Sequence, residues 1–244
     1  MPLYLLYHSS KDHRILEYVL KADSSLAMHT ENTFSAQTLV NRLCTPWTSK
    51  QFSFCPESLE SNVILQDRWT KMVLTVQAAY AHTMGKNLGS HSKPELHVAL
   101  ELECPPMIIC HFVRVYPQQA SILMEGKDCY PLHYILSEYD LKEIPEVLIE
   151  TLVDIFPQAV SHTYQQELPI HIGVSNGLNW KAGLWRIAFA GHDGLDQPHP
   201  QSGLIPLLHS ATMDDIDLST VYCLLQEHPL AIRNLRVQKK TITQ

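Results

Sequence analysis

The sequence predicts an all-α protein in which about six similar helix-hairpin units, joined by short extended connectors, stack into a solenoid. Three observations predict this fold. A short motif built around Pro-Leu-His recurs from residue 95 onward at intervals of 36 to 38 residues. A second motif, an aromatic residue or histidine followed by proline, recurs in fixed order with the first. An apolar stripe with helical spacing precedes each proline-containing copy of the second motif.

The first motif opens the short first helix of each unit. Its clearest copies are Pro131-Leu132-His133 and Pro169-Ile170-His171, and Leu96-His97 carries part of it. Proline suits the first turn of a helix, because the amide proton that it lacks would have no partner there. We therefore expect Pro131, His133, Pro169, His171 and His97 to form the structural turns between units. The unit starts fall near residues 2, 35, 95, 131, 169 and 206.

A longer second helix follows in each unit. The pair Leu148-Ile149, repeated four residues later as Leu152-Val153, places four apolar side chains on one face of such a helix. The prolines in Tyr116-Pro117, Phe156-Pro157 and His228-Pro229 are expected to end these helices and to be followed by an extended connector.

These signals describe a single domain over residues 1–244. The second unit holds an insertion at about 45–60 and then a helix at about 61–82, whose aromatic residues we expect to pack on the back of the solenoid rather than bind a partner. The boundaries of the units are about 2–34, 35–94, 95–130, 131–168, 169–205 and 206–235, with a basic tail at 236–244.

A unit that opens with Pro-Leu-His and continues as two antiparallel helices resembles the ankyrin repeat. The Phe-Pro and Tyr-Pro helix ends are similar to those of a divergent ankyrin-like group found in unicellular algae. One departure is that Tyr130, Leu168 and Ile205 replace the usual threonine before the motif, so its hydroxyl bond is lost. The resemblance implies that a partner is held by the connector tips and the first helices, at Glu31, Lys127, Asp128, Tyr134, Ser137, Tyr164, Gln165 and His199.

The composition fits this interpretation. With 18 basic and 25 acidic residues the chain has a net charge of −7, which argues against a DNA-binding domain. Hydrophobic residues make up 45% of the sequence, which excludes a wholly disordered chain. The six cysteines are irregularly spaced and do not form a disulfide framework. We expect an intracellular protein of the cytoplasm or nucleus, without a membrane-spanning segment.

One motif suggests a different function. Residues 173–177 match the Gly-x-Ser-x-Gly turn of serine hydrolases, in which a strand leads through the serine, here Ser175, into a helix. Acidic residues and histidines follow in the chain order of a catalytic triad. We favour a turn between two helices, because the preceding Pro169-Ile170-His171 belongs to the repeat. The remaining triad candidates are Asp193, Asp196, His199, His209 and His228.

Other polar clusters have simpler explanations. His192, Asp193, Asp196 and His199 are side chains of metal-binding type, yet their spacing fits a polar connector better. The acidic run Asp214, Asp215 and Asp217 precedes a helix, whose dipole it would complement. The residues Trp180 and Trp185 are expected to pack in the core. No cofactor or metal is expected.

The predicted function is a non-enzymatic module that binds a partner protein, with no role in nucleic-acid or membrane binding. The alternatives are a serine hydrolase that uses Ser175 and a regulatory fragment of a larger protein. The last is suggested by Met1-Pro2-Leu3, which leads into the first helix without a polar cap. Such an end is expected to be covered by missing sequence or by another chain.

Overall fold

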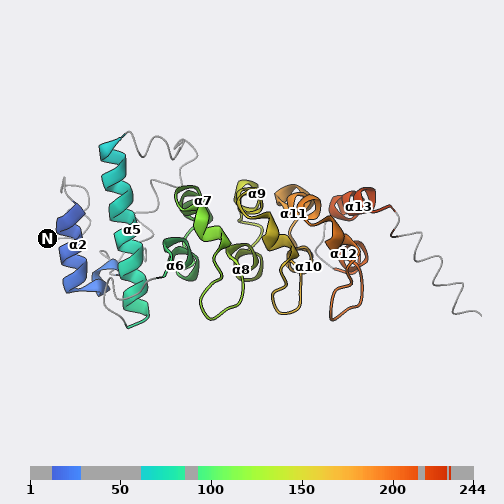
Figure 1. Cartoon of the computed structure of the whole chain (residues 1–244), viewed down its shortest axis with the longest axis horizontal. Helices are drawn as coiled ribbons and strands as arrows, with labels where there is room; N and C mark the ends of the chain where they lie inside the picture. Colours follow the sequence, from blue (N-terminus) through green and yellow to red (C-terminus); the bar gives the residue numbers. More distant parts are fainter. Residues whose placement is uncertain (1–12, 29–61, 86–92, 214–217, 230, 232–244) are drawn as a thin grey trace, which may run out of the picture. The chain divides into compact units, whose positions relative to one another are not determined.

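The computed structural model describes residues 13–28, 62–85, 93–213, 218–229 and 231 (Figure 1). Within these residues the regular structure consists of ten α-helices and several short 3₁₀ helices, with no β-strand. One isolated antiparallel bridge joins Tyr164 and Glu167. The prediction of an all-α chain is confirmed for the described residues. Their helices include none that is both long enough and apolar enough to cross a membrane.

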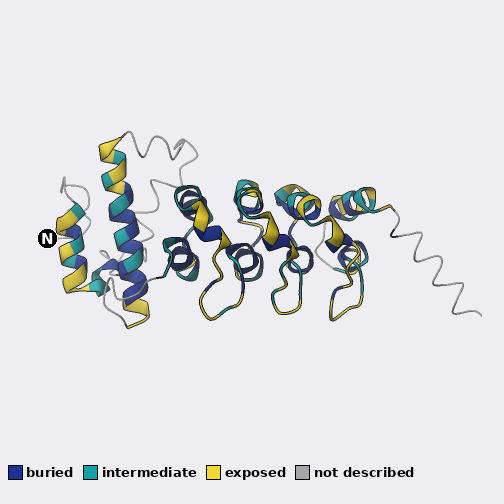
Figure 2. Cartoon of the chain, in the orientation of Figure 1, coloured by how far each residue is buried: buried dark blue, intermediate teal, exposed yellow. Residues whose placement is uncertain are grey.

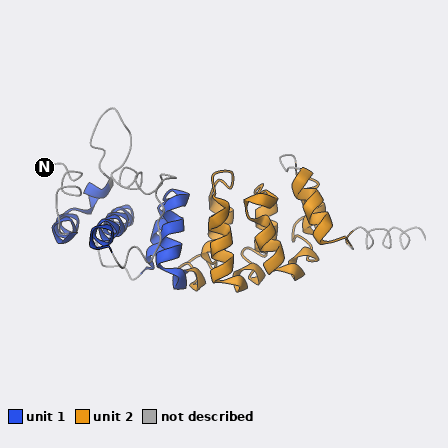
Figure 3. Cartoon of the chain, turned by 90° about the horizontal axis from the view of Figure 1, so that it is seen from above, with its two compact units in different colours: residues 1–119 blue, residues 120–244 orange. Residues whose placement is uncertain are grey.

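The chain divides into two compact units, residues 1–119 and 120–244 (Figure 3). The first unit contains α2 (His13–Ala22), α5 (Val63–Thr83), α6 (Glu95–Glu101) and α7 (Pro106–Val115). Helix α5 packs against both α2 and α6, and it confirms the helix expected at about 61–82. It begins after Asn62, whose side chain accepts hydrogen bonds from the amides of Ile64 and Leu65. The insertion at about 45–60 lies outside the described residues.

The second unit contains three short helices that alternate with three other helices. The short ones, α8 (Pro131–Glu138), α10 (Pro169–Ser175) and α12 (Pro206–Ser210), lie in a row in which α10 contacts both of the others. The others are α9 (Glu146–Ile155), α11 (Leu184–Ala190) and α13 (Leu218–Glu227). Helix α9 packs on α8 and α11, and α13 packs on α12. The loops that lead into α8, α10 and α12 extend to the same side of the helices (Figure 1).

The helix starts follow the proline pattern of the sequence. Pro131, Pro169 and Pro206 are the first residues of α8, α10 and α12, and the residue before each has an extended backbone. The preceding residues, Tyr130, Leu168 and Ile205, make no side-chain capping bond, because they lack the short polar side chain that caps a helix. The buried faces of the helices are turned toward their neighbours, whereas much of the three loops is exposed (Figure 2).

The prediction that an extended connector follows each second helix directly was wrong. After α7, α9 and α11 the chain first makes a short 3₁₀ helix, at Pro117–Ser121, Pro157–Ser161 and His192–Leu195. Proline ends an α-helix because it lacks an amide proton, but its fixed φ is compatible with a 3₁₀ turn. The amide of Ala159, for example, donates to the Phe156 carbonyl at 3.1 Å.

The placement of Trp180 and Trp185 in the core was also wrong. Both residues are only partly buried, and each ring lies near that of Phe189, which is 54% exposed. The inward face of α11 is taken by Leu184 and Ile187, which are buried. Trp185 follows Leu184 by one residue and is therefore rotated away from that face.

Candidate binding site

Three buried histidines make the same hydrogen bond at equivalent places in the chain. The Nε2 atoms of His97, His133 and His171 lie 3.2, 2.8 and 3.0 Å from backbone carbonyl oxygens. These carbonyls belong to Gln119, in the 3₁₀ helix after α7, and to His162 and Gln197, which lie just beyond the 3₁₀ helices that follow α9 and α11. A carbonyl only accepts, so Nε2 carries the proton in each ring. Each bond fastens a first helix to the connector that follows its own hairpin.

Burial keeps these rings uncharged near neutral pH. Desolvation lowers the pKa of His133 from its ordinary value of 6.5 to about 4, and it also lowers the pKa of His97 and His171. Hydrogen bonds to the carbonyls oppose this effect without cancelling it. A neutral ring that donates from Nε2 stabilises the fold by linking its helix to the connector.

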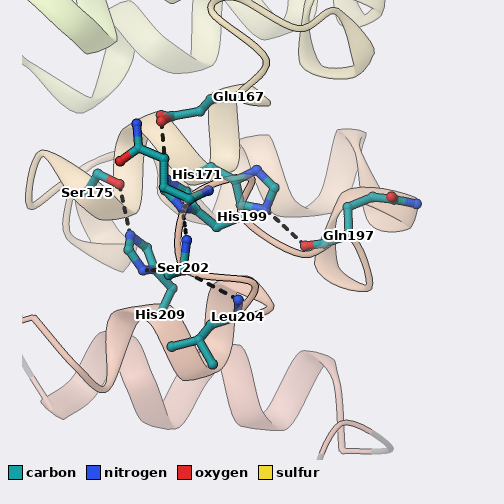
Figure 4. A network of polar contacts seen from close by, with 9 residues as sticks. Glu167, His171, Ser175, Gln197, His199, Ser202, Leu204 and His209 are labelled. Carbon is teal, nitrogen blue, oxygen red and sulfur yellow. Dashed lines mark hydrogen bonds and ion pairs between the residues drawn. The ribbon is translucent and has the colours of Figure 1, made fainter.

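A cavity of about 320 Å³ lies in the second unit, beside the first helices and the loops that lead into them. We call it the polar cavity. Residues of α8, α10 and α12 contribute to its wall together with the loops before α10 and α12. Figure 4 shows polar contacts made by several of these residues. Its lining consists of Ser137, Tyr164, Gln165, Glu167, Ile172, Ser175, Asn176, His199, Gln201, His209 and Met213.

A chain of hydrogen bonds runs through His209. Its Nε2 lies 2.9 Å from the hydroxyl oxygen of Ser175 at the end of α10, and its Nδ1 lies 3.3 Å from that of Ser202. Burial, and to a smaller extent the neighbouring His199, lowers the pKa of His209. The ring is therefore neutral near pH 7, with one nitrogen accepting and one donating.

The tautomer of His199 is fixed by its surroundings. Its Nδ1 accepts hydrogen bonds from the amides of Gln201 and Ser202 at 3.3 and 3.2 Å. The proton is therefore on Nε2, which lies 3.2 Å from a carboxylate oxygen of Glu167. The His199 ring also stacks on that of His209, with centroids 4.3 Å apart. These contacts hold two loops and two helices together around the polar cavity (Figure 4).

The geometry of Ser175 differs from that of a hydrolase nucleophile. Ser175 is the last residue of α10, so the strand-to-helix turn that the motif would require is replaced by a helix end. The turn between helices that we favoured is confirmed, with Gly177 at φ 75°. The second nitrogen of His209 contacts Ser202 instead of a carboxylate, and Asp196 is paired with His228 at 2.9 Å.

Four of the predicted partner-binding residues come together at the polar cavity. Ser137, Tyr164, Gln165 and His199 all line it, although they lie on three different segments of the chain. Ser137 and Ser175 also share a position, since each follows the opening proline of its helix by six residues.

The other predicted partner-binding residues are placed elsewhere. Tyr134 is only 6% exposed, and the Lys127 ammonium lies over its ring at 4.3 Å from the centroid. Tyr134 lies on α8, as expected, but its ring packs against Lys127 and little of it reaches the surface. Asp128 is exposed in the loop before α8, and Glu31 lies outside the described residues.

Sequence reasoning did not predict several of the residues that line the polar cavity. Ser175 could have been found there from its equivalence to Ser137. Glu167, Asn176 and His209 carry no such signal, because their convergence depends on how neighbouring helices and loops align. The Asp214, Asp215 and Asp217 run and the basic tail at 236–244 lie outside the described residues.

A second cavity, of about 540 Å³, lies between the segment that leads into α10 and the end of α11 with the residues that follow it, and is lined by Phe189, His192 and Asp193 among others. In the described part of the chain, His, Cys, Asp and Glu side chains form no group of three placed to hold a metal ion. Comparison of the chain with protein family models, with curated proteins and with solved structures finds no match.

Proposed function

We propose that this chain is a non-enzymatic, ankyrin-like repeat protein that binds a partner protein at the polar cavity and the loop tips around it. The observation that carries the proposal is the convergence of Ser137, Tyr164, Gln165 and His199 on one cavity. The resemblance to the ankyrin repeat predicts these four residues as partner-binding without reference to the cavity. The four residues come from three separate segments of the chain.

Two regularities support the repeat architecture in this proposal. Proline opens α8, α10 and α12, and a buried histidine in α6, α8 and α10 bonds to the connector after its own hairpin. Units that repeat both features stack on their neighbours in one direction, which leaves a row of first helices and loops along one side.

The cavity wall suits recognition of another protein. Its hydroxyl, amide and imidazole groups can exchange hydrogen bonds with a partner, and the contacts of His199 and His209 fix the wall in advance. A site that is ordered before binding loses less conformational entropy on association. The cavity volume also suits side chains of an inserted segment more than a large cofactor.

The test is proximity labelling in the native cell with two double variants. Gln165→Ala with Gln201→Ala removes two exposed amides from the polar cavity, and Gln158→Ala with Gln226→Ala removes two exposed amides elsewhere in the second unit. We expect the first pair to lower capture of at least one specific partner by about tenfold, as loss of central contacts does. The second pair should leave that capture unchanged.

Two results would contradict the proposal. One is identical capture by both double variants and the unaltered chain, since the cavity would then play no part in binding. The other is covalent labelling of Ser175 by a fluorophosphonate probe, with loss of labelling in His209→Ala. That result would support the hydrolase alternative, in which His209 accepts the serine proton.

A further inference from the structure

Charge is distributed very unevenly along the chain. Residues 120–231 contain 15 acidic and 4 basic residues, a net charge of −11, whereas residues 1–119 contain ten of each. The polar cavity lies in the strongly acidic part. A negative field of this kind attracts cationic partners and repels nucleic acids and acidic proteins.

The cavity itself carries a negative charge that its own wall does not neutralise. Glu167 is the one carboxylate among the lining residues, and none of them is lysine or arginine. The imidazole of His199 bonds to Glu167 as a neutral donor, because its Nδ1 already accepts two backbone amide bonds. Since burial lowers the pKa of His209, that ring also stays neutral at pH 7.

The remaining polar groups of the wall can accept hydrogen bonds from a cation. Ser137 and Ser175 offer hydroxyl oxygens, and Gln165, Asn176 and Gln201 offer amide oxygens. Ammonium and guanidinium groups have several donors and no acceptor, so they match a wall of this kind. A volume of about 320 Å³ accommodates one or two side chains of an extended segment and is too small for a folded domain.

We infer that the partner presents an extended basic segment, one lysine or arginine of which enters the polar cavity and pairs with Glu167. This inference rests on the proposed function and names the chemistry of the partner. Acidic residues outside the cavity steer the segment, and Glu167 with its neutral neighbours fixes the entering side chain. Neutral contacts alone would not distinguish a basic from an acidic segment.

The experiment uses the full chain and two fluorescent twelve-residue peptides, one alternating lysine with serine and the other glutamate with serine. Binding is followed by fluorescence polarisation. We expect the lysine peptide to bind and Glu167→Gln to weaken its binding about tenfold, as loss of a partly buried charge partner does. Glu143→Gln makes the same change of charge on an exposed loop and should weaken binding less than about twofold. Circular dichroism checks that both variants remain folded.

Equal weakening by Glu167→Gln and Glu143→Gln would overturn the inference, because attraction would then be diffuse. So would an absence of binding by the lysine peptide. If proximity labelling finds a partner that depends on Gln165 and Gln201 but has no basic segment, the inference fails while the proposed function stands.

A further variant, in which Arg233, Arg236, Lys239 and Lys240 are all neutralised, tests whether the chain's own basic tail occupies the polar cavity. A gain in peptide affinity of about tenfold would assign the cavity to the tail and overturn its assignment to a partner.

Discussion

At the scale of single residues, the buried histidines have the clearest physical role. On folding, His97, His133 and His171 each lose the hydration of the imidazole ring and gain a hydrogen bond to a backbone carbonyl. A ring that must stay neutral to remain buried links the stability of the fold to pH.

The stability of the chain should fall as pH decreases from about 6.5 toward 4. In this range an unfolded chain protonates its histidines near pH 6.5, while folded His133 stays neutral down to a pH of about 4. The unfolded state therefore binds more protons, and its free energy falls relative to that of the folded state as pH decreases. At about 1.4 kcal/mol per pKa unit, His133 alone contributes of the order of 2–3 kcal/mol. Urea unfolding at pH 7 and pH 4.5 measures the effect.

The matched variant is His133→Phe, which removes the titrating group and keeps an aromatic ring. It should be less stable than the unaltered chain at pH 7, because the carbonyl of His162 loses its donor. Its stability should also change less between the two pH values. An unchanged pH dependence in this variant would refute the assignment of the effect to His133.

At the scale of helices, the sequence predicted the elements whose signals are local. Proline marks the starts of α8, α10 and α12 because its effect on the backbone depends on neighbours in the chain. The 3₁₀ helices were missed because the same proline is compatible with either an extended or a 3₁₀ continuation. The exposure of Trp185 was missed because it depends on the rotation of α11 against its neighbours.

Gly183, which precedes α11, lies where the chain comes very close to α9. Gly183 has φ 117°, and a Cβ atom there would lie 2.7 Å from the Cβ of Ile149 in α9. We expect Gly183→Ala to lower the free energy of unfolding by about 3 kcal/mol, from backbone strain and a clash with a packed side chain. Thermal and urea unfolding measure this loss.

Gly126 provides the control. It has φ 75°, but no other atom lies within 4 Å of the place that a Cβ atom would take in its loop. Gly126→Ala introduces strain without a clash and should cost about 1 kcal/mol. If the two alanine variants were equally stable, contact between α9 and the start of α11 would not be what requires glycine at position 183.

At the scale of the whole molecule, the polar cavity is the feature that sequence reasoning predicted least completely. The resemblance to the ankyrin repeat named Ser137, Tyr164, Gln165 and His199. Their convergence with Glu167 and His209 was not predicted, because it depends on contacts such as that between Ser175 and His209, which are 34 residues apart. Local patterns locate loops and helices, whereas the alignment of neighbouring helices decides which side chains meet.

The uneven charge is the other property of this scale, and it predicts that salt stabilises the fold. The −11 charge of residues 120–231 repels itself in the compact state, and added salt screens this repulsion. We expect the free energy of unfolding to rise by about 1 kcal/mol between about 0.02 M and 0.5 M NaCl. Substitutions at two exposed neighbours, Lys142 and Glu143, distinguish charge repulsion from effects of local packing.

Glu143→Lys should stabilise the chain at low salt by a few tenths of a kcal/mol, and Lys142→Glu should destabilise it by roughly as much. Both changes alter the charge by two units at almost the same place, so local packing is matched. The two variants should converge toward the unaltered chain at high salt, because the repulsion is then screened. Shifts in the same direction for both, or a difference that persists at high salt, would show that self-repulsion does not limit the stability of this protein.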